Sequence, residues 1–266
     1  LAFAASYQGA ADGRIHTGLA AHAPYTCGPE FLQQIAAAAR ENGYLLGIHL
    51  AETRDEIATM QERYGKTTVR LMADIGLFEG PVLASHLIWV DEDEIAILAE
   101  NNVTAAHCPQ SNMKLASGIA PVDALLTAGV KVALGTDSAC SNNRLDLFQE
   151  MKAAALLGKV KAKDAAALSA ATVLAMATEQ GAKALDWPGL GLLQEGALAD
   201  IILVDMAKPH LTPLYQPVSH LVYAVSGSDV KTVMVNGELL VADGKLIQLD
   251  EEEICAKATA CSKKFR

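Results

Sequence analysis

Five polar residues, of types that can catalyse reactions or bind metal ions, lie where short apolar segments of the sequence end. They are His22, His49, His86, His107 and Asp137. Histidine is the commonest metal ligand in proteins and the usual proton carrier near neutral pH. One histidine at a strand end is commonly structural. If all five polar groups at strand ends were structural, each would need its own buried hydrogen-bond partner. The set therefore predicts a functional site.

Glu52 lies three residues beyond His49 and is a candidate for proton transfer. A carboxylate can act as general acid and base when its surroundings raise its pKa. The alternative is a solvated glutamate at the start of a helix, but the closeness to His49 favours catalysis. For His107, a hydrogen bond to Asn112 within a loop is an alternative explanation. Three histidines lie outside the pattern and are predicted to be structural: His16, His210 and His220.

The elements that position these residues alternate between short apolar strands and longer amphipathic helices, which is typical of βα units in a parallel sheet. The predicted strands span residues 18–22, 44–50, 82–86, 104–107 and 130–136. In an α/β barrel, the carboxyl ends of the strands converge on one face, so these polar residues should meet there. The last helix of this part is predicted at residues 172–185, with Thr172 as its N-cap.

The character of the sequence changes after about residue 185. Turn residues become frequent, and strands are predicted at residues 201–204, 230–235 and 238–241, with Asn236-Gly237 as a hairpin turn between the last two. A terminal helix begins at residue 251. We therefore predict two parts: residues 1–185 form a portion of an α/β barrel, and residues 186–266 form a small β module with a terminal helix.

The composition of the 266 residues limits the binding partners and the cellular location that we expect. The net charge of −10 argues against nucleic acid or an anionic membrane as the main ligand. No apolar run is long enough to span a bilayer. The five cysteines include no C-x-x-C pair, which indicates reduced thiols and a cytoplasmic protein.

Several stretches resemble the amidohydrolase superfamily, in its branch of 5-methylthioadenosine/S-adenosylhomocysteine deaminases, which is related to the triazine chlorohydrolases. The stretches are residues 21–27 (AHAPYTC), 49–53 (HLAET), 84–86 (ASH), 107–115 (HCPQSNMKL), 135–143 (GTDSACSNN) and 189–205. The resemblance covers nearly the whole chain in the family's order. It implies a (β/α)8 TIM-type barrel that lacks its first strands here, followed by a C-terminal portion of a composite β-sandwich.

The resemblance also implies a role for each matching residue. His49 and Asp137 would be metal ligands, and Asp137 would also act as a base. Glu52 would carry a proton to the purine ring, His86 would orient the attacking hydroxide, and His22, with Glu52 and Asp137, would contact the substrate. The implied cofactor is one divalent metal, zinc or alternatively iron, which lowers the pKa of bound water. The implied reaction is hydrolytic deamination of an adenine nucleoside.

One family feature has no counterpart in this sequence. The family takes two metal ligands from a His-x-His motif on its first strand, and no His-x-His occurs here. Two ligands are fewer than the three that catalytic zinc sites usually use. We therefore expect residues 1–266 to belong to a longer protein, to need an associated N-terminal fragment of it, and to be inactive alone. Exposed sheet edges would favour a homo-oligomer.

Two alternatives to adenine nucleoside deamination follow from the same residues. The first is deamination or dechlorination of another ring, such as guanine, cytosine or an s-triazine, because substrate specificity resides in loops. The second is an inactive truncated paralogue, which the missing His-x-His favours. Glu52, His86 and Asp137 argue against the second alternative, since an inactive relative has no need to retain them.

Overall fold

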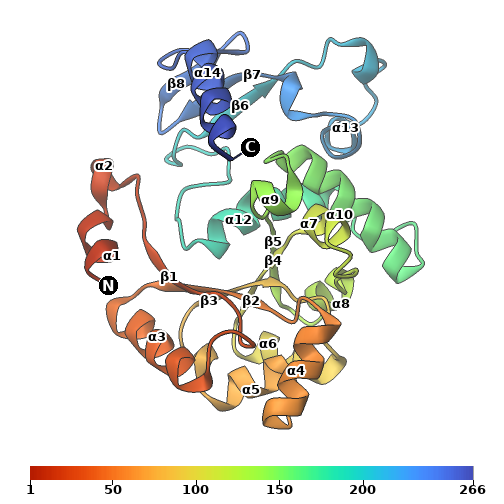
Figure 1. The fold of residues 1–266 in the computed structure, drawn as a ribbon. Helices are drawn as coiled ribbons and strands as arrows, with labels where there is room; N and C mark the ends of the chain where they lie inside the picture. The colour runs from red at the N-terminus through yellow and green to blue at the C-terminus, as the bar shows by residue number, and fades with distance from the viewer. Residues whose placement is uncertain (266) are drawn as a thin grey trace.

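A five-stranded parallel sheet forms the centre of the computed structural model, which describes residues 1–265. Its strands lie in chain order, each parallel to the next (Figure 1). They are β1 (Gly18–Ala21), β2 (Leu45–Leu50), β3 (Val82–His86), β4 (Thr104–His107) and β5 (Lys131–Leu134). All five predicted strands are present, and the predicted α/β fold class is confirmed.

Helices connect these strands and cover one face of the sheet (Figure 1). Their ends follow from capping residues: Pro29 begins α3, Gly43 ends it in a left-handed conformation, and the Thr53 hydroxyl caps α4. The helices of this part are α1 (Ala2–Tyr7), α2 (Ala10–Gly13), α3 (Pro29–Asn42), α4 (Arg54–Tyr64), α5 (Thr68–Asp74), η1 (Leu77–Glu79), α6 (Glu92–Glu100), α7 (Pro109–Lys114), α8 (Val122–Thr127), α9 (Ala139–Asn142), α10 (Leu147–Ala162), α11 (Ala170–Ala177) and α12 (Glu179–Ala184).

The hydrophobic core lies between the sheet and these helices. In β2 the buried residues Leu46, Ile48 and Leu50 alternate with half-buried ones, as the period of two in a strand requires. The alternation places His49 on the face opposite to this core. The site residue is therefore presented on the side of the sheet that the helices leave open.

The segment predicted as one helix over residues 172–185 is two helices, α11 and α12, and that prediction was wrong. Thr178 separates them with non-helical backbone angles, and its hydroxyl donates a hydrogen bond to the carbonyl of Leu174. Such back-bonding by threonine bends helices. The N-cap is Ser169, whose hydroxyl accepts from the Thr172 amide, so Thr172 is not the cap.

A smaller antiparallel sheet follows, with β6 (Ile201–Val204), β7 (Val230–Val235), β8 (Glu238–Ala242) and β9 (Lys245–Leu246) in chain order. The predicted hairpin turn at Asn236-Gly237 joins β7 to β8, and both residues have positive φ. Around it lie η2 (Pro209–Leu211), α13 (Pro217–Tyr223), η3 (Gly227–Asp229), α14 (Glu251–Ser262) and η4 (Lys263–Phe265). Helix α13 packs against α10 and α11, so this part contacts the first.

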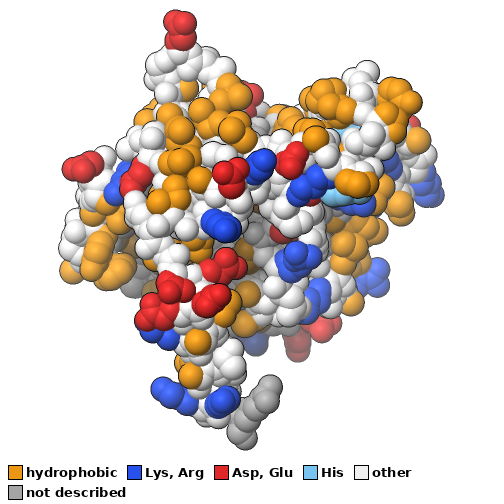
Figure 2. All heavy atoms as spheres, turned by 90° about the horizontal axis from the view of Figure 1, so that it is seen from above, with side chains coloured by type: hydrophobic (Ala, Val, Ile, Leu, Met, Phe, Trp, Pro, Cys, Tyr) orange, Lys and Arg blue, Asp and Glu red, His pale blue; other side chains and the backbone are white. Residues whose placement is uncertain are grey.

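The surface seen from above in Figure 2 carries acidic, basic and apolar side chains interspersed with one another. Exposed apolar residues include Leu193 and Tyr215, which are 81% and 79% exposed. None of the helices within residues 1–265 combines the length and the apolar character needed to cross a bilayer.

Candidate active site

Three imidazole rings from successive strands lie side by side at the carboxyl ends of β1, β2 and β3. The ring centroids of His22 and His49 are 5.4 Å apart, and those of His49 and His86 are 5.5 Å apart. His22 is exposed, His49 is half-buried and His86 is buried. The row therefore leads from the surface inward.

Left-handed backbone conformations occur where the strands end at this site. Ala51, His86 and Asp137 have φ of 53°, 79° and 59°. By strand alternation His86, which pairs with Leu50, would point toward the helices. The left-handed turn instead directs its ring to the His49 side of the sheet. Such strained residues cluster at functional sites, where surrounding contacts hold them in place.

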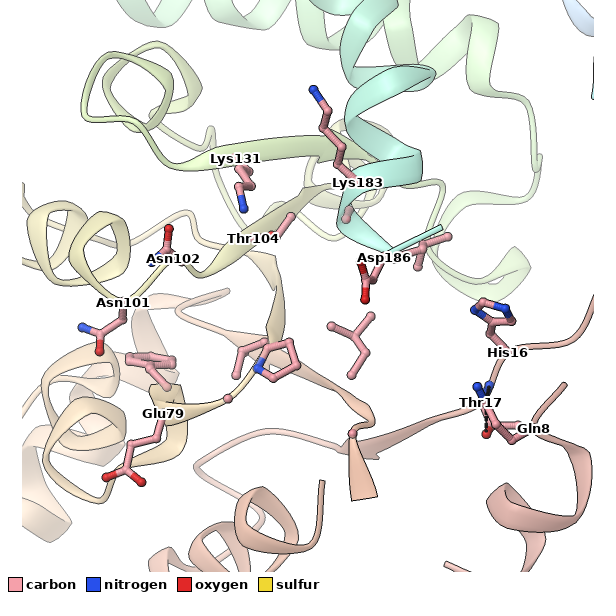
Figure 3. A pocket seen from close by; sticks show the side chains of 18 residues that line it. Gln8, His16, Thr17, Glu79, Asn101, Asn102, Thr104, Lys131, Lys183 and Asp186 are labelled. Atoms are coloured by element: carbon pink, nitrogen blue, oxygen red, sulfur yellow. Dashed lines mark hydrogen bonds between the residues drawn. The ribbon is translucent and has the colours of Figure 1, made fainter. Parts of the chain in front are cut away.

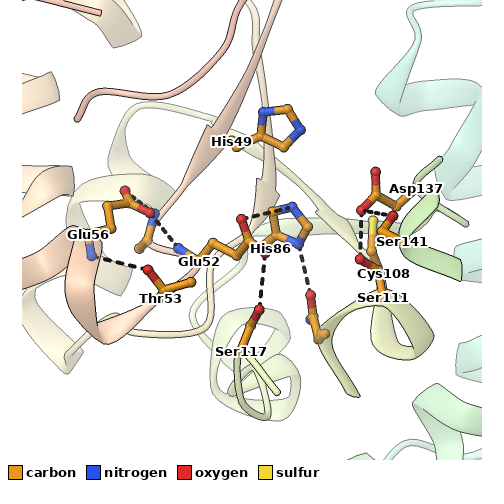
Figure 4. A network of polar contacts seen from close by, with 12 residues as sticks. His49, Glu52, Thr53, Glu56, His86, Cys108, Ser111, Ser117, Asp137 and Ser141 are labelled. Atoms are coloured by element: carbon orange, nitrogen blue, oxygen red, sulfur yellow. Dashed lines mark hydrogen bonds and ion pairs between the residues drawn. The ribbon is translucent and has the colours of Figure 1, made fainter. Parts of the chain in front are cut away.

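The Glu52 carboxylate lies beside His86 (Figure 4). Its Oε2 is 3.9 Å from Nε2 of His86, and its Oε1 accepts a hydrogen bond of 3.1 Å from the Ser117 hydroxyl. The Glu52 side chain is 20% exposed. Ser117 is itself held, because its carbonyl accepts a 2.8 Å bond from the Trp89 indole N–H.

Asn112 fixes the orientation of the His86 ring. Its side-chain oxygen lies 2.8 Å from Nδ1 of His86, so Nδ1–H donates to it and Nε2 faces Glu52. The alternative explanation of His107 as a partner of Asn112 is therefore wrong. His107 is buried, and burial together with the nearby His86 lowers its pKa to about 4, which keeps it neutral at pH 7.

Asp137 stands on the other side of His86 from Glu52 (Figure 4). Its Oδ2 accepts bonds of 2.6 and 2.7 Å from the hydroxyls of Ser111 and Ser141, and its Oδ1 accepts from the Ser138 amide. Burial would raise the pKa of Asp137, but these hydrogen bonds outweigh it and hold the pKa below its usual value. Asp137 is therefore ionised at neutral pH.

Two buried glutamates support the loops that carry these residues. Glu56 accepts bonds from the amides of Ala51 and Glu52, at 2.8 and 2.9 Å. Glu150 accepts bonds from the Asn142 side chain at 2.6 Å and from the amide of Gln110 at 3.2 Å. Burial raises the pKa of both carboxyls, and these hydrogen bonds partly offset the rise.

The donor atoms of His49 and Asp137 fit a divalent metal in type. Nδ1 of His49 lies 2.7 Å from the His22 carbonyl, so it carries the proton and leaves Nε2 free to coordinate. Metal-binding histidines typically donate their second nitrogen in this way. Within residues 1–265 there is no group of three His, Cys, Asp or Glu side chains arranged to hold a metal. The two residues therefore match a metal site in donor type alone.

The structure brings together all the residues that the sequence singled out, and it adds others. Ser117, Glu56 and Glu150 had no recognisable feature in the sequence. Ser111 and Asn112 lie within the stretch 107–115 that resembles the family, although their contacts could not be predicted from it.

A separate cavity of about 640 Å³ opens at the opposite end of the sheet. It is lined by the amino-terminal ends of the strands, including Leu45, Val82 and Thr104, and by polar side chains such as Lys183 (Figure 3). None of the predicted site residues lines this cavity, so it is distinct from the cluster around His86.

Comparisons with known proteins found several that this chain is similar to. A 5-methylthioadenosine/S-adenosylhomocysteine deaminase from Pelotomaculum thermopropionicum is 50% identical over 258 residues, which cover 97% of this chain and 60% of that protein. A 5'-deoxyadenosine deaminase from Methanosarcina mazei is 50% identical over 256 residues, covering 96% and 59%. A solved zinc-bound adenosine deaminase from Xanthomonas campestris superposes with a TM-score of 0.94 at 35% identity, covering 99% of this chain and 61% of that one.

The chain thus spans about 60% of the length of the curated relatives it matches. The family resemblance noted from the sequence is confirmed, because the model of the Amidohydrolase family matches residues 2–240. This chain belongs to the amidohydrolase family.

Proposed function

We propose that the protein hydrolyses an adenine nucleoside, replacing the 6-amino group by oxygen and releasing ammonia. The observation that supports this most strongly is the Glu52 carboxylate, held by Ser117 and placed 3.9 Å from Nε2 of His86. Two relatives of about 50% identity are named as deaminases of 5'-modified adenosines. An adenine nucleoside with a modified 5' position is therefore the proposed substrate.

We propose one divalent metal, zinc, as the cofactor, with His49 and Asp137 among its ligands and iron as the alternative. Support comes from the free Nε2 of His49 and from the zinc in the solved adenosine deaminase. When bound, such an ion supplies hydroxide near neutral pH by lowering the pKa of water. The two residues would supply only part of the ligand set, since no group of three possible ligands occurs within residues 1–265.

The side chains around the substrate would divide the proton transfers between them. Glu52, whose side chain is held by Ser117 and is 20% exposed, would pass a proton to the ring nitrogen next to the attacked carbon. It would take a proton back from the added hydroxyl group as the ring carbonyl forms. Asp137, kept ionised by two hydroxyls, would accept the proton of the attacking water and return it to the departing ammonia. His86 would orient the attacking hydroxide through Nε2, since its Nδ1–H is bonded to Asn112. His22, exposed at the rim, would contact the nucleoside.

The test compares substrates with the full-length protein, prepared in the presence of zinc. Ammonia release would be measured with 5'-deoxyadenosine, 5'-methylthioadenosine, S-adenosylhomocysteine, adenosine, guanine, cytosine and an s-triazine. The proposal predicts the highest kcat/KM for an adenine nucleoside. Turnover of guanine, cytosine or a triazine, without turnover of any adenine nucleoside, would contradict the proposed substrate class. No turnover and no bound zinc would indicate an inactive relative.

We also propose the division of the chain into residues 1–185 and 186–266, since the parallel sheet ends before it and the antiparallel sheet begins after it. A cytoplasmic location is supported by the five free cysteines in the described residues. We also propose that the protein is a homo-oligomer.

A further inference from the structure

Three glutamates are nearly inaccessible to solvent although none belongs to the proposed reaction. Glu56 and Glu94 are 2% exposed and Glu150 is fully buried. Burial of a carboxylate is costly unless hydrogen bonds or a cation compensate for it. The hydrogen-bond partners of each glutamate therefore indicate its structural role.

Glu56 and Glu94 hold the same position at the start of a helix but bind different groups. Each is the third residue of its helix, α4 or α6, and each amide donates to the side chain of the N-cap residue. Glu94 returns a bond to the amide of its own N-cap, Asp91, which makes an ordinary capping box. Glu56 instead reaches past its N-cap to the two preceding residues, Ala51 and Glu52.

The amides bound by Glu56 belong to the turn that carries Glu52 toward the site. Ala51 is left-handed, with φ of 53°, which is unfavourable for a residue with a Cβ. Its carbonyl accepts bonds of 3.0 and 2.9 Å from the amides of Ile88 and Trp89, just beyond His86. The turn after β2 is therefore hydrogen-bonded to Glu56 through the Ala51 amide and to the turn after β3 through the Ala51 carbonyl.

The two bonds require the carboxylate form of Glu56. Each oxygen accepts from one amide N–H, so a glutamine there could satisfy one amide and would present its own N–H groups to the other. The N-terminus of α4, an eleven-residue helix, favours an anion at this point.

We propose that Glu56 is a positioning residue for Glu52, holding the left-handed turn that sets the Glu52 carboxylate against His86. This inference rests on the proposed function, because positioning Glu52 matters for turnover only if Glu52 transfers a proton. Glu56 does not touch the substrate. Its effect is on where the Glu52 carboxylate lies.

The test uses the full-length, zinc-loaded protein with Glu56→Gln, and Glu94→Gln as the matched control. Glu94→Gln changes an equally buried glutamate at the same helix position, whose carboxylate contacts Thr67, Arg70 and the Asp91 amide and none of the proposed site residues. With 5'-methylthioadenosine, Glu56→Gln should lower kcat by about 10- to 100-fold, since small misplacements of a catalytic group have effects of this size. KM should stay within about threefold, because ground-state binding is retained. Glu94→Gln should leave kcat within about twofold of wild type.

Amide hydrogen exchange provides a second readout that does not depend on turnover. Exchange at Ala51 and Glu52 should become about tenfold faster in Glu56→Gln, while exchange in β4 stays unchanged. Unchanged exchange at these amides, or a kcat equal to that of wild type, would overturn the inference. An equal loss of kcat in Glu94→Gln would also overturn it, since the effect would then be general destabilisation. An inactive wild-type protein would refute the proposed function, and altered exchange would still establish that Glu56 holds the turn.

Discussion

Nε2 of His86 lies 3.9 Å from Oε2 of Glu52. Each of the two side chains is also hydrogen-bonded to a residue of the segment 112–117. Asn112 binds the far nitrogen of His86, and Ser117 binds the other oxygen of Glu52. The Ser117 amide in turn donates to the Asn112 carbonyl at 2.9 Å. Residues 112–117 therefore set the relative placement of the two groups.

Replacement of Ser117 by alanine should lower kcat of the full-length enzyme by about fivefold. The variant loses one hydrogen bond to Glu52, and such a bond contributes about 1 kcal/mol. Steady-state kinetics with 5'-methylthioadenosine would measure the change. Ser262→Ala, in an exposed serine of α14 whose hydroxyl donates to the Thr259 carbonyl, is the control and should have no effect. An unchanged kcat in Ser117→Ala would show that this bond does not matter for turnover.

Replacement of Asn112 by alanine should destabilise the protein by about 1–3 kcal/mol. The change leaves Nδ1–H of the buried His86 without its acceptor, and an unsatisfied buried donor has a cost of this size. Urea unfolding would give the free energy of unfolding. The exposed Asn101, whose side chain donates to the Ile97 carbonyl, offers Asn101→Ala as a control with a change below about 0.5 kcal/mol. Equal stability of both variants would contradict the role of Asn112.

Gly118→Ala should be more destabilising than Gly129→Ala, although both glycines have positive φ. A Cβ at Gly118 would lie 2.8 Å from a methyl carbon of Ile88 and 3.2 Å from the Trp89 ring, whereas a Cβ at Gly129 would meet nothing within 4 Å. Both variants carry the backbone strain, so their difference measures the steric clash beside Ser117. We expect about 1–3 kcal/mol more for Gly118→Ala in thermal unfolding. Equal effects would mean that the segment shifts freely.

The β module should lose stability in acid because of Asp229. Burial would raise the pKa of this carboxyl, but bonds from Lys208, the Ser226 amide and His210 hold it below its ordinary value of 3.8. A folded-state pKa below the unfolded one stabilises the fold above about pH 4, and this contribution is lost as the pH falls below 3.8.

The variant Asp229→Asn should therefore be less stable than wild type at pH 7 and should show a flatter decline on acidification. Unfolding followed by circular dichroism between pH 7 and pH 2 would measure both. Asp243→Asn is the control, because Asp243 is 87% exposed and its only ion pair, within residues 1–265, is at 3.8 Å to Lys231. Parallel acid profiles for wild type and Asp229→Asn would refute this account.

The strand ends could be predicted from the sequence because each apolar run stops at a polar residue. His22 and His49 follow from that pattern and from strand alternation alone. The direction of His86 could not be predicted, since alternation points it toward the helices and a left-handed φ of 79° reverses this. Ser117 was missed because α7, which precedes it, has only six residues, PQSNMK, without an apolar period. The break at Thr178 was missed because a threonine inside a helical pattern does not by itself end a helix.

Ammonia release from an adenine nucleoside by wild type and by Glu52→Gln is the decisive measurement for the role of Glu52. Both proteins would be full-length, and their zinc content would be measured on the same samples. We predict equal zinc in the two proteins and a loss of turnover of about 100-fold or more in Glu52→Gln, because the variant cannot transfer a proton. Turnover by Glu52→Gln at the wild-type rate, with the same zinc content, would contradict it.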